Sequence, residues 1–209
     1  MSFCLRRAVF VHVPKTGGTW VRKVLQDAGL VIGQVGRDHA TPAELFRLDH
    51  PLVSSAPLLF SFVRHPLAWY QSYWCYRMKH GWHRPSPGEA EAPIRTVSLD
   101  AHCRADDFPT FVANCLERYP QGWVSYLYER YTTGCAFVGR QERLAEDLTH
   151  ALLLSGARLS RKVIAAVRTT PPANVASGDV DWLPRCQYPA DLRERVLAAE
   201  QHALETWGY

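Results

Sequence analysis

Long hydrophobic runs, closely paired cysteines and blocks of like charge are all missing from this sequence. No stretch approaches the roughly 18–20 apolar residues that a membrane-spanning helix needs. Residues 1–13 also lack the long apolar core and the cleavage site of a signal peptide. The six cysteines form no Cys-x-x-Cys pair, which favours reduced thiols over disulfides or a metal site. These absences predict a cytoplasmic protein with no membrane span and no bound metal.

A strong charge imbalance is absent as well. The formal net charge is +4, and no run of five or six like charges occurs. This mild basic bias suits an anionic ligand, but it is too weak to indicate binding to nucleic acid. With 209 residues, 47% of them hydrophobic, the chain is expected to form one domain over 1–209 with a substantial core.

Segments with the character of strands and helices alternate along the chain. Residues 8–13 and 57–63 are short and apolar, as buried strands are. Residues 19–28 and 67–79 follow these two segments and show the apolar spacing of helices. The alternation predicts an α/β fold, a three-layer domain with a mostly parallel central sheet flanked by helices, similar to that of P-loop NTPases.

Further elements are predicted from capping residues, turn residues and periodicity. The segment Thr41-Pro-Ala-Glu44 has the capping box that starts a helix. A stretch rich in proline and glycine begins at Gly81 and predicts a mobile loop over 81–107. The remaining expectations are a third strand over 135–139, a loop over 169–184, and helices over 108–118, 124–130, 142–154 and 191–207.

The segment Val11-His-Val-Pro-Lys-Thr-Gly-Gly-Thr-Trp20 joins the first strand to the first helix. The N–H groups at a helix start lack intrahelical partners and carry partial positive charge, so phosphate or sulfate is their natural ligand. Gly17 and Gly18 let the backbone approach an oxyanion closely. Lys15 adds a formal charge, and the hydroxyl groups of Thr16 and Thr19 add donors.

The order of these residues differs from that of a nucleoside-triphosphate P-loop. Such a loop ends in Gly-Lys-Ser/Thr, and its Ser/Thr holds magnesium. Here Lys15 precedes the glycines, and the second strand ends in Arg64 with no obvious metal-binding Asp. The loop is therefore expected to bind an anion without a metal.

Residues 11–19 resemble the 5′-phosphosulfate loop of sulfotransferases, which use 3′-phosphoadenosine 5′-phosphosulfate (PAPS) as donor. The Pro-Lys-Thr-Gly-Gly-Thr form is most similar to that of carbohydrate sulfotransferases. The resemblance implies that Lys15 is catalytic and that the loop from Lys15 to Thr19 binds the sulfated end of PAPS. Trp20 is similar to a residue that helps to sandwich adenine in the small-molecule branch. The product would be adenosine 3′,5′-bisphosphate.

A second segment, Phe62-Val-Arg-His-Pro-Leu-Ala-Trp-Tyr-Gln-Ser-Tyr73, resembles the sulfotransferase strand that ends in arginine and is followed by a serine eight residues later. The resemblance implies that Arg64 and Ser72 bind the 3′-phosphate of PAPS. Arginine offers a fork of charged donors that suits phosphate. Pro66 ends the strand and starts a helix, on which Ser72 can face back toward the arginine.

An acceptor hydroxyl needs a base, and His39 is the first candidate. It lies in Gly36-Arg-Asp-His-Ala-Thr41, in the region where the resembled family often has a catalytic His or Glu. Asp38 could orient the ring or act as the base itself. His12 and His65 are expected to have structural roles. Secondary base candidates are His50, His80 and His83.

These features predict a PAPS-dependent sulfotransferase that acts on a hydroxyl of a carbohydrate or small molecule. Two alternatives stay open. A P-loop nucleotide kinase is disfavoured by the order of the loop, and a non-catalytic nucleotide-binding protein is disfavoured by the presence of Lys15, Arg64 and Ser72. The acceptor could be a glycan, a lipid headgroup or a hydroxylated natural product.

Overall fold

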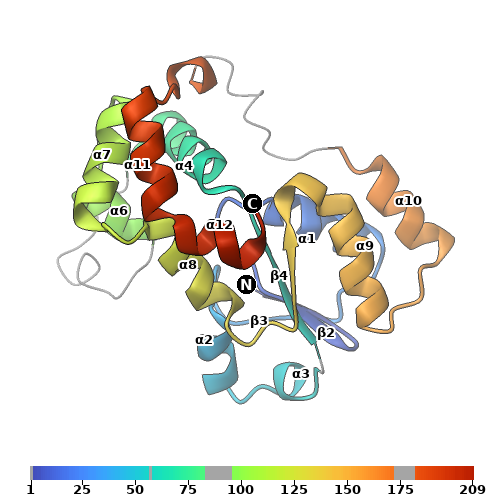
Figure 1. The fold of residues 1–209 in the computed structure, drawn as a ribbon. Helices are drawn as coiled ribbons and strands as arrows, with labels where there is room; N and C mark the ends of the chain where they lie inside the picture. Colours follow the sequence, from blue (N-terminus) through green and yellow to red (C-terminus); the bar gives the residue numbers. More distant parts are fainter. Residues whose placement is uncertain (1, 57, 83–95, 172–181) are drawn as a thin grey trace. The chain divides into compact units, whose positions relative to one another are not determined.

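The computed structural model describes residues 2–56, 58–82, 96–171 and 182–209. The chain divides into two compact units, each formed by two segments of the sequence (Figure 1). The sheet unit comprises Met1–Arg64 and Tyr128–Asn174, and the helical unit comprises His65–Leu127 and Val175–Tyr209. The polypeptide leaves the sheet unit directly after Arg64 and re-enters it within the helix α8 (Trp123–Thr132).

Five strands in the order β3-β1-β2-β4-β5 form the sheet. They are β1 (Ser2–Leu5), β2 (Ala8–Phe10), β3 (Gly33–Val35), β4 (Leu58–Val63) and β5 (Phe137–Arg140). β1 is antiparallel to both of its neighbours, whereas β2, β4 and β5 are parallel to one another. The predicted α/β class, with a mostly parallel central sheet flanked by helices, is confirmed.

Three helices of the sheet unit cover one face of the sheet (Figure 1). Apolar side chains of these helices pack against those of β1, β2 and β4 in a single core cluster. The helices are α1 (Gly18–Asp27), α9 (Leu144–Leu154), which follows the short 3-10 helix η1 (Gln141–Arg143), and α10 (Arg161–Thr169). Two shorter helices, α2 (Pro42–Arg47) and α3 (Pro51–Ser54), follow β3, and α2 begins with the predicted capping box.

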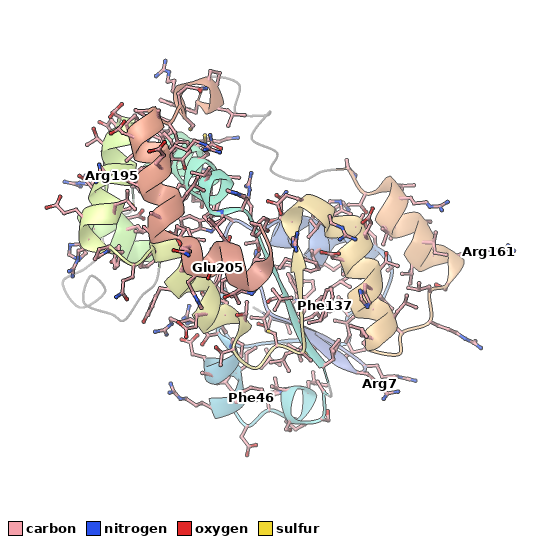
Figure 2. The ribbon with its side chains drawn as sticks, viewed as in Figure 1. Arg7, Phe46, Phe137, Arg161, Arg195 and Glu205 are labelled. Atoms are coloured by element: carbon pink, nitrogen blue, oxygen red, sulfur yellow. The ribbon has the colours of Figure 1, made fainter. Side chains whose placement is uncertain are left out.

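Strand register places an aromatic row across that face of the sheet. Phe3 pairs with Phe10, Phe10 with Phe60, and Phe60 with Phe137. Phe137, labelled in Figure 2, packs against the same core cluster. Because side chains alternate between the faces of a strand, this register directs the whole row into the core. The row fixes where each strand ends relative to its neighbours, and those ends carry the candidate site.

The helical unit holds α4 (Pro66–His80), α6 (Thr96–His102), α7 (Phe108–Arg118), the first half of α8 (Trp123–Thr132), the 3-10 helix η3 (Leu183–Arg185), α11 (Ala190–Ala199) and α12 (Gln201–Trp207). Glu200 separates the last two helices and is fully buried. Its carboxylate accepts hydrogen bonds from the Tyr70 hydroxyl, the Val124 N–H, and both the N–H and the hydroxyl of Ser125. Burial raises the pKa of Glu200, although these four donors act in the opposite direction.

Several elements differ from the sequence-based expectation. The strands β1 and β3 and the helix α10 were not predicted, and the helix expected over 191–207 is two helices. Residues 96–102, expected within a mobile loop, form α6. β1 and β3 pair with each other across the sequence, and β1 also pairs with β2, which directly follows it. Local propensity does not report such pairing. None of the described helices is long and apolar enough to cross a membrane.

Candidate anion site

The candidate site lies at the carboxyl ends of β2 and β4, two neighbouring parallel strands. From β2 the chain passes through α1 to β3, the outermost strand at one end of the strand order. From β4 it goes on to β5, the outermost strand at the opposite end. The place where connections diverge in this way is the usual ligand site of open α/β sheets. The structure therefore brings the glycine loop and Arg64, both in the sheet unit, to one edge of the sheet.

The loop after β2 bends sharply into α1. Lys15 and Gly17 both have positive φ angles, 66° and 84°, and Gly17 is the N-cap of α1. A glycine N-cap has no side chain to satisfy the first N–H groups of the helix, so these groups remain suited to an anion. Thr16 is buried, and its hydroxyl donates to the carbonyl of Val13 at 2.9 Å. That hydroxyl therefore donates its hydrogen within the turn and holds the turn together.

Gly18 is required because the His12 ring packs directly against it. A Cβ atom at this position would lie 1.9 Å from Cδ2 and 2.0 Å from Nε2 of His12. His12 is 8% exposed, and its Nδ1 atom has no hydrogen-bond partner in the described part of the chain. The expectation that His12 is packed is confirmed, and its packing explains why the second glycine of the loop is needed.

The end of β4 is anchored by a tyrosine. The Tyr128 hydroxyl accepts a hydrogen bond from the Arg64 N–H at 3.0 Å and donates one to the Arg64 carbonyl at 2.7 Å. Both polar groups of the arginine backbone are thus paired where the strand has ended. This arrangement orients the half-buried Arg64 at the same edge of the sheet as the glycine loop.

His39 is held in a strained conformation beside His12. Its φ angle is 55°, which is unusual for any residue but glycine, and its carbonyl accepts a hydrogen bond from the Tyr131 hydroxyl at 2.8 Å. The two imidazole rings have centroids 4.4 Å apart. Since His12 also contacts Gly18, the structure brings the predicted base next to the residue that packs against the start of α1.

One hydrogen bond determines where His39 can carry its proton. Its Nδ1 atom lies 3.0 Å from the His12 carbonyl, which can only accept. Nδ1 must therefore carry hydrogen, and in the neutral ring Nε2 is left with a lone pair. A histidine in this tautomer can take a proton from a hydroxyl through Nε2.

Both histidines are biased toward the neutral form. Burial lowers the pKa of His39, while the hydrogen bond to His12 and the charge of Asp38 act in the opposite direction. Burial, followed by the neighbouring His39 and Arg22, holds the pKa of His12 well below its usual value. At neutral pH His39 is therefore uncharged and able to accept a proton.

Two other predicted residues have different surroundings. The Asp38 side chain is 72% exposed and lies 3.8 Å from the Arg22 guanidinium. Trp20 is 8% exposed, belongs to the core cluster, and donates its indole N–H to the Thr170 carbonyl at 3.1 Å. Its predicted contact with adenine stays a prediction. Ser72 lies on α4, in the helical unit, so its assignment still depends on the sequence resemblance.

The other candidate histidines have structural contacts. His50 and His65 each accept a hydrogen bond from the backbone N–H two residues later and so cap α3 and α4. His80 lies at the end of α4, with its ring 4.5 Å from that of Tyr76. His83 lies outside the described residues. Among the candidate histidines in the described part of the chain, His39 thus has the geometry that suits a base best.

Sequence reasoning missed the two tyrosines that support the site. Tyr128 and Tyr131 are three residues apart on α8, and they bind the backbones of Arg64 and His39 across 64 and 92 residues of sequence. Only Tyr128 lies within the helix predicted over 124–130; α8 extends to Thr132, and on it a spacing of three residues gives a shared face. Nothing in the sequence names their partners, because those contacts exist only after the sheet has formed.

No family model, curated protein or solved structure matched this chain in the comparisons. Among the described residues, no group of three or more His, Cys, Asp or Glu side chains is arranged to hold a metal ion.

Proposed function

We propose that this protein is a sulfotransferase that moves a sulfuryl group from PAPS to an acceptor hydroxyl, on a P-loop-NTPase-like three-layer fold. The observation that carries the proposal is that the glycine loop and Arg64 follow adjacent parallel strands in one unit. A helix N-terminus with a lysine and a separate arginine offers two anion-binding positions. PAPS has two anionic groups, a 5′-phosphosulfate and a 3′-phosphate.

Backbone strain supports the roles of two residues. Three non-glycine residues in the described part of the chain have positive φ angles, Lys15, His39 and Asp49. The first two are the residues that the proposed reaction needs. Strained backbone persists only where surrounding contacts hold it, and it is concentrated at functional sites. For His39 these contacts are the hydrogen bonds with Tyr131 and His12.

In the proposed reaction, the acceptor oxygen forms a bond to sulfur as the bond between sulfur and the 5′-phosphate oxygen breaks. The Nε2 atom of His39 takes the proton of the acceptor hydroxyl. Lys15 neutralises the charge that develops on the departing phosphate oxygen, and the loop N–H groups hold that phosphate. Arg64 binds the 3′-phosphate, and the sequence resemblance adds Ser72 to this role. The work is positioning and electrostatic stabilisation, as in phosphoryl transfer.

Calorimetry with two nucleotides tests the donor site. With a chelator present, the protein should bind adenosine 3′,5′-bisphosphate more tightly than adenosine 5′-monophosphate, which lacks the 3′-phosphate. Arg64→Ala should weaken bisphosphate binding by roughly 10–100-fold, the value of one or two charge-assisted hydrogen bonds, and should leave monophosphate binding nearly unchanged. Ser72→Ala should act in the same direction with a smaller effect.

Arg47→Ala is the matched control, because Arg47 is an exposed arginine of α2 in the same unit. It should change neither affinity. Absence of bisphosphate binding without magnesium would refute the donor site, and tight binding of ATP only with magnesium would favour a nucleotide kinase.

Transfer of labelled sulfate to a panel of glycans, lipid headgroups and phenolic compounds tests the reaction itself. Lys15→Ala should lower turnover by about a hundredfold. His39→Ala should depress turnover and leave bisphosphate affinity nearly unchanged. Bisphosphate binding without transfer to any acceptor would favour a non-catalytic nucleotide-binding protein.

A further inference from the structure

Two buried cysteines of the helical unit lie side by side. The Sγ atoms of Cys75, on α4, and Cys186, directly after η3, are 3.3 Å apart. Both residues are almost fully buried, at 2% and 0% exposure, and both are thiols in this structure. A disulfide bond requires about 2.05 Å between the sulfur atoms, so the atoms need to approach by only about 1.2 Å.

The backbone around this pair is already held in register. Along α4, Leu67, Gln71 and Cys75 are spaced by four residues and therefore share a helix face. The Tyr188 hydroxyl donates to the Leu67 carbonyl at 2.8 Å, and the Gln71 side chain donates to the Cys186 carbonyl at 2.9 Å. The two segments are thus joined at Leu67 and at Gln71 before any covalent bond forms. A disulfide would extend this series of contacts to Cys75.

We propose that Cys75 and Cys186 are a disulfide-forming site that covalently joins α4 to the chain segment leading into α11. This proposal does not depend on the proposed function. It departs from the sequence expectation of reduced thiols, which came from the lack of closely spaced cysteines. The two residues are 111 positions apart, and only the tertiary structure brings them together. A crosslink between such distant positions removes much of the freedom of the unfolded chain, which is how disulfides stabilise proteins.

The bond forms by exchange with a low-molecular-weight disulfide such as oxidised glutathione. One cysteine thiolate attacks that disulfide, forms a mixed disulfide and releases one small thiol. The second cysteine thiolate then attacks the protein sulfur of the mixed disulfide and releases the other small thiol. Two protein thiols are oxidised, one small disulfide is reduced, and the two protons end on the released thiols.

Burial determines how this site can be oxidised. The hydrogen bond with Cys75, followed by burial, raises the pKa of the Cys186 thiol, which makes its thiolate scarce in the folded state. Exchange on the native protein should therefore be slow. Refolding in a redox buffer avoids this limit, because both thiols are exposed before the chain folds.

The test is to refold the reduced, full-length protein in a buffer of reduced and oxidised glutathione, to block remaining thiols by alkylation, and to map crosslinked peptides by mass spectrometry. A peptide joining Cys75 to Cys186 should be the main product. The oxidised protein should melt roughly 5–10 °C above the reduced protein, and dithiothreitol should reverse the difference.

Cys75→Ser and Cys186→Ser should each abolish the crosslink and the rise in melting temperature. Cys135→Ser is the matched control, because this cysteine belongs to the sheet unit and should leave both unchanged. If both Cys75 and Cys186 are recovered as alkylated thiols from protein with a native circular dichroism spectrum, the proposal is wrong.

Discussion

Replacing Gly18 with alanine tests whether the packed His12 ring requires glycine at the start of α1. The new Cβ would lie 1.9 Å from His12 Cδ2, whereas an ordinary contact is 3.4 Å or longer, so the ring would have to move by about 1.5 Å (3.4 − 1.9). The ring is 8% exposed and faces the rings of Phe10 and His39, which leaves little room. Overpacking of this kind costs about 1–3 kcal/mol. For a chain of this length, the melting temperature should fall by roughly 2–12 °C.

Thermal unfolding followed by circular dichroism should be measured for the wild type, Gly18→Ala, His12→Ala and the double variant. The double-mutant cycle isolates the clash, because a chain without the imidazole has space for the added methyl group. In the His12→Ala background, Gly18→Ala should cost less than about 0.5 kcal/mol. The reasoning fails if Gly18→Ala melts at the wild-type temperature, or if it costs the same in both backgrounds.

Three further predictions concern the base and the buried anchors. Burial lowers the pKa of His39, and a base acts only when neutral, so the acid limb of the pH profile of kcat/KM should have its midpoint below pH 6.5. Glu200→Gln should lower the free energy of unfolding by about 1–3 kcal/mol, because an amide nitrogen cannot accept the hydrogen bonds that Ser125 donates. Tyr128→Phe removes both hydrogen bonds to the Arg64 backbone. In calorimetry it should weaken bisphosphate binding, but less than Arg64→Ala does.

The strands and helices that frame the loop could be predicted from the sequence because their signals are local. The apolar run before Pro14 and the helical spacing after Gly18 mark β2 and α1. The capping box at Thr41 and Glu44 spans four consecutive residues, and the structure contains it at the start of α2. Each of these signals lies within a few consecutive residues, so the sequence displays it directly.

Other features were missed because pairing and side-chain contacts, many of them between distant residues, create them. β1 is a strand because its four buried residues pair with β2 on one side and β3 on the other. The helix expected over 191–207 divides at Glu200, whose buried carboxylate binds Ser125 and Val124 at the start of α8. No local preference of the 191–207 segment encodes that partner.

The sequence by itself determined the chemical inventory of the site: a lysine ahead of two glycines, an arginine at a strand end, and a histidine before a capped helix. The tertiary structure decided how these groups are arranged. It placed the loop and Arg64 on adjacent parallel strands, packed His12 against Gly18, and used the His12 carbonyl to fix the proton on Nδ1 of His39. The residue type at each position is a local property of the sequence. Neighbouring strands and hydrogen-bond partners are set only when residues far apart in the sequence come into contact on folding.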